Sequence, residues 1–246
     1  MITYEANKLQ KVMTISLYTT GDVKQYTAQE IEAVKELKEY SIPSDYLLFL
    51  KTYGLGEMNN LLMFNIPDKD YVKNTFSEYM DIWQWEEGDE QKALNSISIG
   101  STIDGDVICL IDTEVPYMIL PRHSDRPIKF NSLAEVIVHY DKMYGLKGDY
   151  YFDSYDDWER LSFDDFIQFK ERRMEVVKQM HQAFFKEYTF DKAYHTEKQP
   201  LYLIKDVGGW IRFDLVYGYS IQLKYQKRYA EKAVEVYSYL QGVMKS

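Results

Sequence analysis

The chain has little cysteine and no long apolar run, and each absence excludes certain classes of protein. Cys109 is the only cysteine among 246 residues, so no internal disulfide can form and cysteine alone cannot build a zinc site. The longest apolar stretches, such as 46–50 and 107–111, are far shorter than the roughly 18 residues of a membrane-spanning helix. Residues 1–16 lack the charged start and continuous apolar run of a secretory signal. These absences predict a cytoplasmic protein that does not span a membrane.

Positive charge is also scarce. The chain has 29 Lys and Arg against 39 Asp and Glu, which gives a formal net charge of −10. Nucleic-acid binding depends on Lys and Arg that neutralise phosphates, so this balance argues against a nucleic-acid partner and favours a basic protein. Hydrophobic residues make up 46% of the chain, which is enough to build a core without a cofactor.

The first third of the sequence predicts two helices. Thr27-Ala28-Gln29-Glu30 has the form of a capping box, and apolar residues at helical spacing extend a helix to about Tyr40. Pro43 suits the first turn of a second helix, and Gly54 offers its C-terminal stop. We predict that these two helices pack against a strand at 107–111 through Ile31, Val34, Leu37, Tyr46, Phe49 and Leu50.

The following region predicts strands and a further helix. Asp104-Gly105 is a hairpin signal between strands 97–102 and 106–112, because glycine tolerates the positive φ of tight turns. Ser132-Leu133-Ala134-Glu135 has the form of a second capping box, for a helix that ends at Gly145. The apolar runs predict strands at 61–64, 97–99, 107–111 and 117–120.

The second half predicts another mixed region. Residues 147–161 show little periodicity and are expected to form a linking loop. Ser162 and Asp165 resemble a cap for a helix that includes Phe166 and Ile167 and ends near Tyr188. Strands at 201–204, 210–216 and 219–223 and a final helix from Tyr229 to Leu240 complete an α+β protein with a mostly antiparallel sheet. We place domains at 1–145 and 146–246, with packing of both as one unit as the alternative.

The residue order from Ala28 to Tyr140 resembles the SUKH superfamily. The segments that carry the resemblance are Ile42-Pro43-Ser44-Asp45-Tyr46-Leu47-Leu48-Phe49-Leu50, Tyr53-Gly54-Leu55-Gly56, Ile97 to Gly100, Asp106 to Asp112, and Ser132 to Ile137. The resemblance implies helices packed on a mostly antiparallel sheet and no catalytic residues. Bacterial members resemble immunity proteins that bind and neutralise a toxin, and some eukaryotic relatives are regulatory scaffolds. The resemblance therefore implies a protein-binding role.

Two acidic segments with interleaved aromatic residues are the candidate partner-binding sites. Segment 78–90 has six acidic residues and no Lys or Arg, and segment 149–165 has seven acidic residues against Arg160. Clustered acids speed association with a basic partner, and aromatic residues anchor interfaces. The alternative is solvated acidic loops whose aromatic rings face inward. The candidate residues are Trp83, Trp85, Glu86, Glu87, Asp89, Glu90, Tyr155, Asp156, Asp157 and Trp158.

The sequence contains no pattern that is typical of a catalytic site or a metal site. Cys109 lies in an apolar run and is expected to be a core residue. Asp104, Asp106 and Asp112 could hold a cation, but a hairpin turn accounts for the first two. No catalytic motif is recognisable, so we predict a protein that is not an enzyme, with a carboxylate-dependent hydrolase as the remaining alternative. The histidines, which lack metal-ligand spacing, are His123, His139, His181 and His195.

Overall fold

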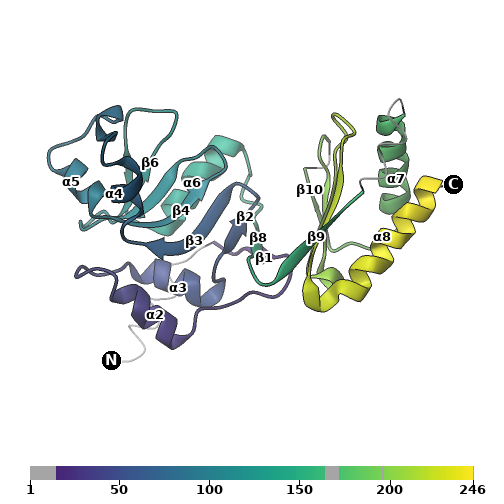
Figure 1. Ribbon diagram of the computed structural model, residues 1–246, viewed down its shortest axis with the longest axis horizontal. Helices are drawn as coiled ribbons and strands as arrows, with labels where there is room; N and C mark the ends of the chain where they lie inside the picture. Colours follow the sequence, from purple (N-terminus) through teal and green to yellow (C-terminus); the bar gives the residue numbers. More distant parts are fainter. Residues whose placement is uncertain (1–14, 164–171, 196, 246) are drawn as a thin grey trace. The chain divides into compact units, whose positions relative to one another are not determined.

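The computed structural model describes residues 15–163, 172–195 and 197–245 and shows the α+β fold expected from the sequence. The chain divides into two compact units (Figure 1). The first unit comprises Val23–Ser154 with the preceding Met1–Tyr18, and the second comprises Tyr155–Ser246 with the short segment Thr19–Asp22. None of the helices in the described part of the chain combines the length and the apolar character that a membrane crossing requires.

The first unit is built on an eight-stranded sheet with the order β1-β8-β2-β3-β4-β5-β6-β7. Neighbouring strands pair antiparallel from β8 through to β7. The strands are β1 (Tyr18–Thr19), β2 (Gly56–Met58), β3 (Leu62–Asp68), β4 (Ile97–Thr102), β5 (Val107–Leu110), β6 (Tyr117–Leu120), β7 (Ile128–Phe130) and β8 (Tyr151–Ser154). The predicted hairpin is confirmed: β4 and β5 are antiparallel neighbours, and Gly105 between them has a φ of 90°.

Three helices cover one face of this sheet: α2 (Ala28–Lys35), α3 (Ser44–Thr52) and α6 (Leu133–Tyr144). The Thr27 capping box is present. Helix α3 ends before Gly54, whose φ is 70°, and a Cβ at that position would lie 1.9 Å from the Lys24 carbonyl oxygen. The packing predicted from the sequence is confirmed, because Ile31, Val34, Tyr46, Phe49 and Leu50 share one buried cluster with Ile108 and Leu110, and Leu37 packs against it half-buried.

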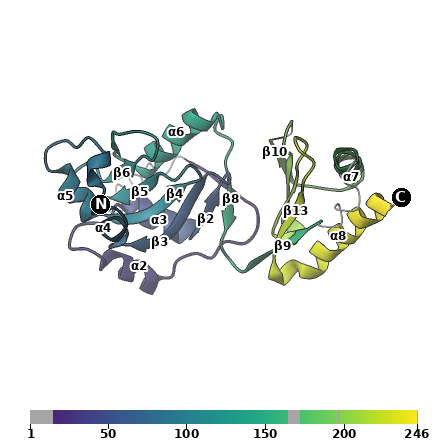
Figure 2. The same ribbon diagram turned by 45° about the horizontal axis from the view of Figure 1, so that its top comes forward.

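An insert between β3 and β4 covers part of the opposite face (Figures 1 and 2). It contains α4 (Tyr71–Phe76), the short 3-10 helix η1 (Met80–Ile82) and α5 (Asp89–Leu94). Alternate residues of the strands point to it, since Cys109 and Met118 pack with the insert whereas Ile108 and Ile119 pack with α2, α3 and α6. The strands β5 and β6 are therefore buried on both sides, which explains their continuous apolar runs.

The second unit is a five-stranded antiparallel sheet with two helices packed against it (Figure 2). The strand order is β10-β11-β12-β13-β9. The strands are β9 (Trp158–Ser162), β10 (Lys192–Tyr194), β11 (Leu201–Ile204), β12 (Gly209–Phe213) and β13 (Ile221–Gln226). The helices are α7 (Arg173–Glu187) and α8 (Ala230–Lys245), with the 3-10 helices η3 (Lys205–Val207) and η4 (Lys227–Tyr229).

Three expectations differ from the structure. The first helix ends at Lys35 rather than near Tyr40, whose hydroxyl instead donates to the Leu110 carbonyl. The predicted loop at 147–161 is wrong, because it contains β8 and most of β9. Strand β8 pairs with β2, so the first unit extends to Ser154, beyond the expected boundary at 145.

The long helix predicted from Ser162 is also wrong at its start. Ser162 is the last residue of β9, and the helix α7 begins at Arg173. The remaining residues of that predicted first turn, Asp165, Phe166 and Ile167, lie outside the described residues.

Candidate partner-binding surface

The two tryptophans of the first acidic segment hold the insert to the sheet. Trp83 is only 5% exposed, and its Nε1 donates a hydrogen bond of 2.9 Å to the Pro121 carbonyl. The half-buried Trp85 donates from Nε1 to the Met80 carbonyl at 2.7 Å. The two rings meet edge to face with centroids 5.7 Å apart, and Phe76 contacts Trp83 at 5.4 Å. Both tryptophans are therefore structural anchors of the insert.

Asp89 is the acidic residue of this segment that faces inward. Its carboxylate lies 2.6 Å from the ammonium of Lys129 on β7 and 3.4 Å from that of Lys92. Lys129 also contacts Glu86 at 2.8 Å. Hydrogen bonds to the two carboxylates raise the pKa of Lys129. This cluster fastens the start of α5 to the strand β7, and a hollow of about 290 Å³ lies beside it, lined by Gln84, Trp85, Glu86, Asp89, Arg126, Pro127 and Lys129.

The outward face of the insert combines acidic and apolar side chains. Tyr79 is 58% exposed and Ile82 is 52% exposed. These two residues are joined by the backbone hydrogen bond from Ile82 N–H to the Tyr79 carbonyl. We call a subset of its exposed acidic and large apolar side chains the insert surface; its residues are Tyr71, Glu78, Tyr79, Asp81, Ile82, Glu87 and Glu90.

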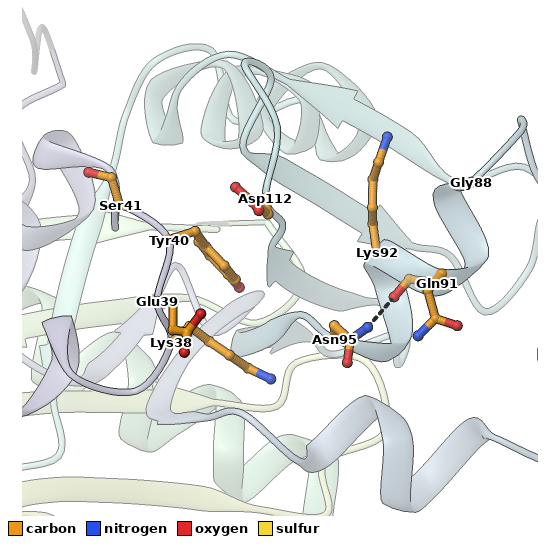
Figure 3. A pocket seen from close by; sticks show the side chains of 9 residues that line it. All are labelled: Lys38, Glu39, Tyr40, Ser41, Gly88, Gln91, Lys92, Asn95 and Asp112. Atoms are coloured by element: carbon orange, nitrogen blue, oxygen red, sulfur yellow. Dashed lines mark hydrogen bonds between the residues drawn. The ribbon is translucent and has the colours of Figure 1, made fainter.

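A polar hollow of about 710 Å³ is lined in part by α5 and meets the insert surface at Gly88, the residue after Glu87. Figure 3 shows the side chains of Tyr40 and Asp112 on one side of it and those of α5 on the other. Burial raises the pKa of Tyr40, so its hydroxyl stays protonated at neutral pH. The hollow offers amides, hydroxyls and charges of both signs; its lining is Lys38, Glu39, Tyr40, Ser41, Gly88, Gln91, Lys92, Asn95 and Asp112.

The candidate residues of the second acidic segment, Tyr155 to Trp158, lie in the second unit, where basic side chains surround them. Asp156 pairs with Arg228, and Asp157 pairs with Lys227 at 2.8 Å. Trp158 is 38% exposed, and the Lys224 ammonium lies 4.4 Å from its ring centroid. The half-buried Tyr155 precedes them at the start of the second unit. The carboxylates of 156 and 157 are therefore balanced by cations of their own unit.

The net charge of the chain is distributed unequally between the two units. Between them, Thr19–Asp22 and Tyr155–Ser246 contain equal numbers of acidic and basic residues, so the formal charge of −10 belongs to the sequence of the first unit. An acidic first unit therefore carries the insert surface. Long-range attraction of a basic partner would act on this unit.

The candidate residues predicted from the sequence did not include Tyr71, Tyr79 or Ile82. The available signal was local: in a tight 3-10 turn, residues three apart share a side, so Tyr79 and Ile82 lie together while Met80 and Trp83 are buried. The residues of the polar hollow come from three separate segments, and no local pattern joins them.

The thiol of Cys109 and the carboxylate of Asp106 are buried groups that belong to the packing of the fold. Cys109 is fully buried, and burial raises the pKa of its thiol to about 12. Asp106 accepts hydrogen bonds from the Tyr140 hydroxyl and the Arg122 backbone N–H. Within 15–163, 172–195 and 197–245, no three His, Cys, Asp or Glu side chains gather closely enough to hold a metal ion.

Comparison of the chain with protein-family models, with curated proteins and with solved structures found no match.

Proposed function

We propose that this chain is an immunity-type protein that neutralises a basic bacterial toxin domain by stoichiometric binding in the cytoplasm. The proposal combines the resemblance of residues 28–140 to the SUKH superfamily with the surface of the first unit. Within the segment that carries the resemblance, Asp45 joins the start of α3 to β6 and α6 by hydrogen bonds.

The observation that carries the proposal is the exposure of Tyr79 and Ile82 among carboxylates on a firmly anchored insert. Large apolar side chains at a surface favour a protein partner, and aromatic residues supply much of the binding energy of interfaces. The surrounding Glu78, Asp81 and Glu87 favour Lys and Arg on that partner. Because Trp83 and Lys129 already fix the insert, its surface loses little conformational entropy on binding.

The adjoining polar hollow extends this surface. Its amides and charges of both signs offer hydrogen bonds to a partner loop, as in the polar parts of protein interfaces. Gly88 lines the hollow and lies between Glu87 and Asp89, so one partner could contact the acidic loop and the hollow together. In this proposal the toxin is inhibited because its active site or substrate groove is covered.

Co-expression with a toxin encoded beside the gene tests the proposal. Wild-type protein should form a one-to-one complex and restore growth, whereas the variant Tyr79→Ala/Ile82→Ala should protect poorly. The matched control is Ile66→Ala, which removes an exposed isoleucine of β3 outside the insert. Failure of the wild-type chain to bind or protect would reject the immunity role, and neighbouring genes unrelated to toxins would favour a regulatory scaffold instead.

A further inference from the structure

We propose that the loop between β12 and β13 in the second unit is a separate protein-binding surface whose partner is an apolar peptide segment carrying a carboxylate. The inference goes beyond the proposed function, because it concerns the other unit and a partner of opposite charge. It rests on an exposed aromatic pair, on the rigidity of the loop, and on the half-buried guanidinium of Arg173 beside it.

The aromatic pair is formed by Tyr217 and Tyr219. Their rings are nearly parallel, at 12° with centroids 5.9 Å apart, and their exposed fractions are 65% and 67%. Val216 is also exposed beside them. Tyrosine supplies a large contact area with few rotatable bonds, which is why binding loops are rich in it. Three neighbouring large side chains at one loop therefore form an anchor surface for an apolar segment.

Asp214 holds the loop in one conformation. Its buried carboxylate accepts hydrogen bonds from the backbone N–H groups of Val216, Tyr217 and Tyr219, at 3.0, 3.0 and 3.2 Å. Gly218 has a φ of 68°, and a Cβ there would lie 2.9 Å from the Met174 backbone in α7. The loop is thus ordered before any partner arrives, so binding costs less conformational entropy.

Arg173 indicates the charge of the partner. Its guanidinium carbon lies 5.7 Å from the Tyr219 ring centroid, and its buried Nε donates to no acceptor among the described residues. A guanidinium matches a carboxylate with two parallel hydrogen bonds. A carboxylate on the partner would pair with this half-buried guanidinium while an apolar side chain contacts the tyrosines. Beside them, a hollow of about 720 Å³ lined in part by Glu197, Lys198, Val216 and Tyr217 offers room for that side chain.

Charge distinguishes a peptide from a nucleic acid as the partner. The second unit is neutral in sequence and the whole chain carries −10, so a polyphosphate would be repelled rather than concentrated. A single carboxylate next to an apolar residue requires only the local cation. The geometry therefore favours a peptide with one acidic group over a nucleic acid.

Selection of short peptides displayed on phage, with the full chain as bait, tests the inference. The selected peptides should place Asp, Glu or a free C-terminus next to an apolar residue. Their affinity should fall roughly tenfold or more for Tyr217→Ser/Tyr219→Ser and remain unchanged for the control Val234→Ser, which alters an exposed residue of α8. Circular dichroism establishes that each variant is folded.

The carboxylate contact has its own readout. Changing the acidic residue of a selected peptide to its amide should weaken binding to the wild-type chain, and this loss should disappear in Arg173→Gln, because the two changes remove one interaction. The inference is overturned if no peptide is selected, if the tyrosine variant binds equally well, or if the peptide amide weakens binding to wild type and Arg173→Gln alike. Selection of RNA or DNA ligands in place of peptides would likewise overturn it.

Discussion

The hydroxyl of Tyr117 donates a hydrogen bond of 2.6 Å to the carboxylate of Asp45. The second oxygen of the same carboxylate accepts the backbone N–H of Leu133 at 2.7 Å. Asp45 lies in the first turn of α3, Tyr117 lies on β6 and Leu133 is the first residue of α6, so one buried carboxylate links two helices to the sheet. Burial first, and then the neighbouring Asp45, raise the pKa of Tyr117, which keeps this donor protonated.

Replacing Asp45 by Asn should lower the free energy of unfolding by about 1–3 kcal/mol, because an amide cannot accept all of these buried donors. Urea unfolding monitored by circular dichroism measures the loss. Asp112→Asn changes an exposed carboxylate of the same unit and should alter the free energy by less than about 0.5 kcal/mol. Equal effects of the two changes would contradict the anchoring role of Asp45.

Trp83 and the insert surface should respond differently to truncation. Trp83→Ala should cost about 3–5 kcal/mol of stability, because it removes a buried ring and its hydrogen bond. Tyr79→Ala and Ile82→Ala should change stability by less than about 0.5 kcal/mol but speed dissociation of the bound partner. Thermal unfolding and surface plasmon resonance separate the two effects. A stable Trp83→Ala protein would show that the insert is held in another way.

The acidic residues of the two units should differ in their effect on association. Glu87→Lys/Glu90→Lys should slow association with a basic toxin by roughly tenfold at low salt and much less at high salt, because screening shortens the reach of charge. Asp156→Asn/Asp157→Asn should leave association unchanged, since these carboxylates are paired with Arg228 and Lys227. Stopped-flow binding across salt concentrations tests both statements. A larger effect from the second pair would place the interface in the second unit.

His181 should make the second unit less stable in mild acid. Its Nε2 lies 2.6 Å from the Tyr202 hydroxyl, and burial lowers its pKa below 6.5. Between the lowered folded value and 6.5 the unfolded chain binds more protons, so stability falls as the pH drops through this window. Urea midpoints on either side of pH 6.5 should show a smaller loss for His181→Gln than for wild type. His123→Gln, at an exposed position, should behave as wild type does.

Local signals were sufficient for much of the first unit. The caps at Thr27 and Ser132, the glycines at 54 and 145 and the Asp104-Gly105 turn each require a particular backbone geometry, and the structure shows those geometries. Strand β8 escaped prediction because Tyr151, Phe152, Asp153 and Ser154 are all buried, which removes the alternation that identifies a half-buried strand. Strand β9 also lacks this alternation, but because most of its residues are exposed. It lies at the edge of its sheet.

The candidate surface could be predicted only in part. The acidic composition of 78–90 located the insert, but composition cannot tell which ring is an anchor and which is exposed. That distinction depends on long-range partners, such as the Pro121 carbonyl for Trp83 and Lys129 for Asp89. The acidic character of 149–165 indicated nothing about Lys227 and Arg228, which follow much later in the chain.

The segment Thr19–Asp22 belongs to the second unit although the first unit follows it in the chain. The Asp22 backbone exchanges hydrogen bonds of 3.0 and 2.7 Å with the side chain of Gln226, 204 residues later. During synthesis, Asp22 leaves the ribosome early, but its hydrogen bonds to Gln226 can form only after β13 has been made. Residues 23–154 can fold before that point. A chain cut short before Gln226 would therefore contain the whole sequence of the acidic unit, whereas the second sheet would lack both its N-terminal contact and the helix α8.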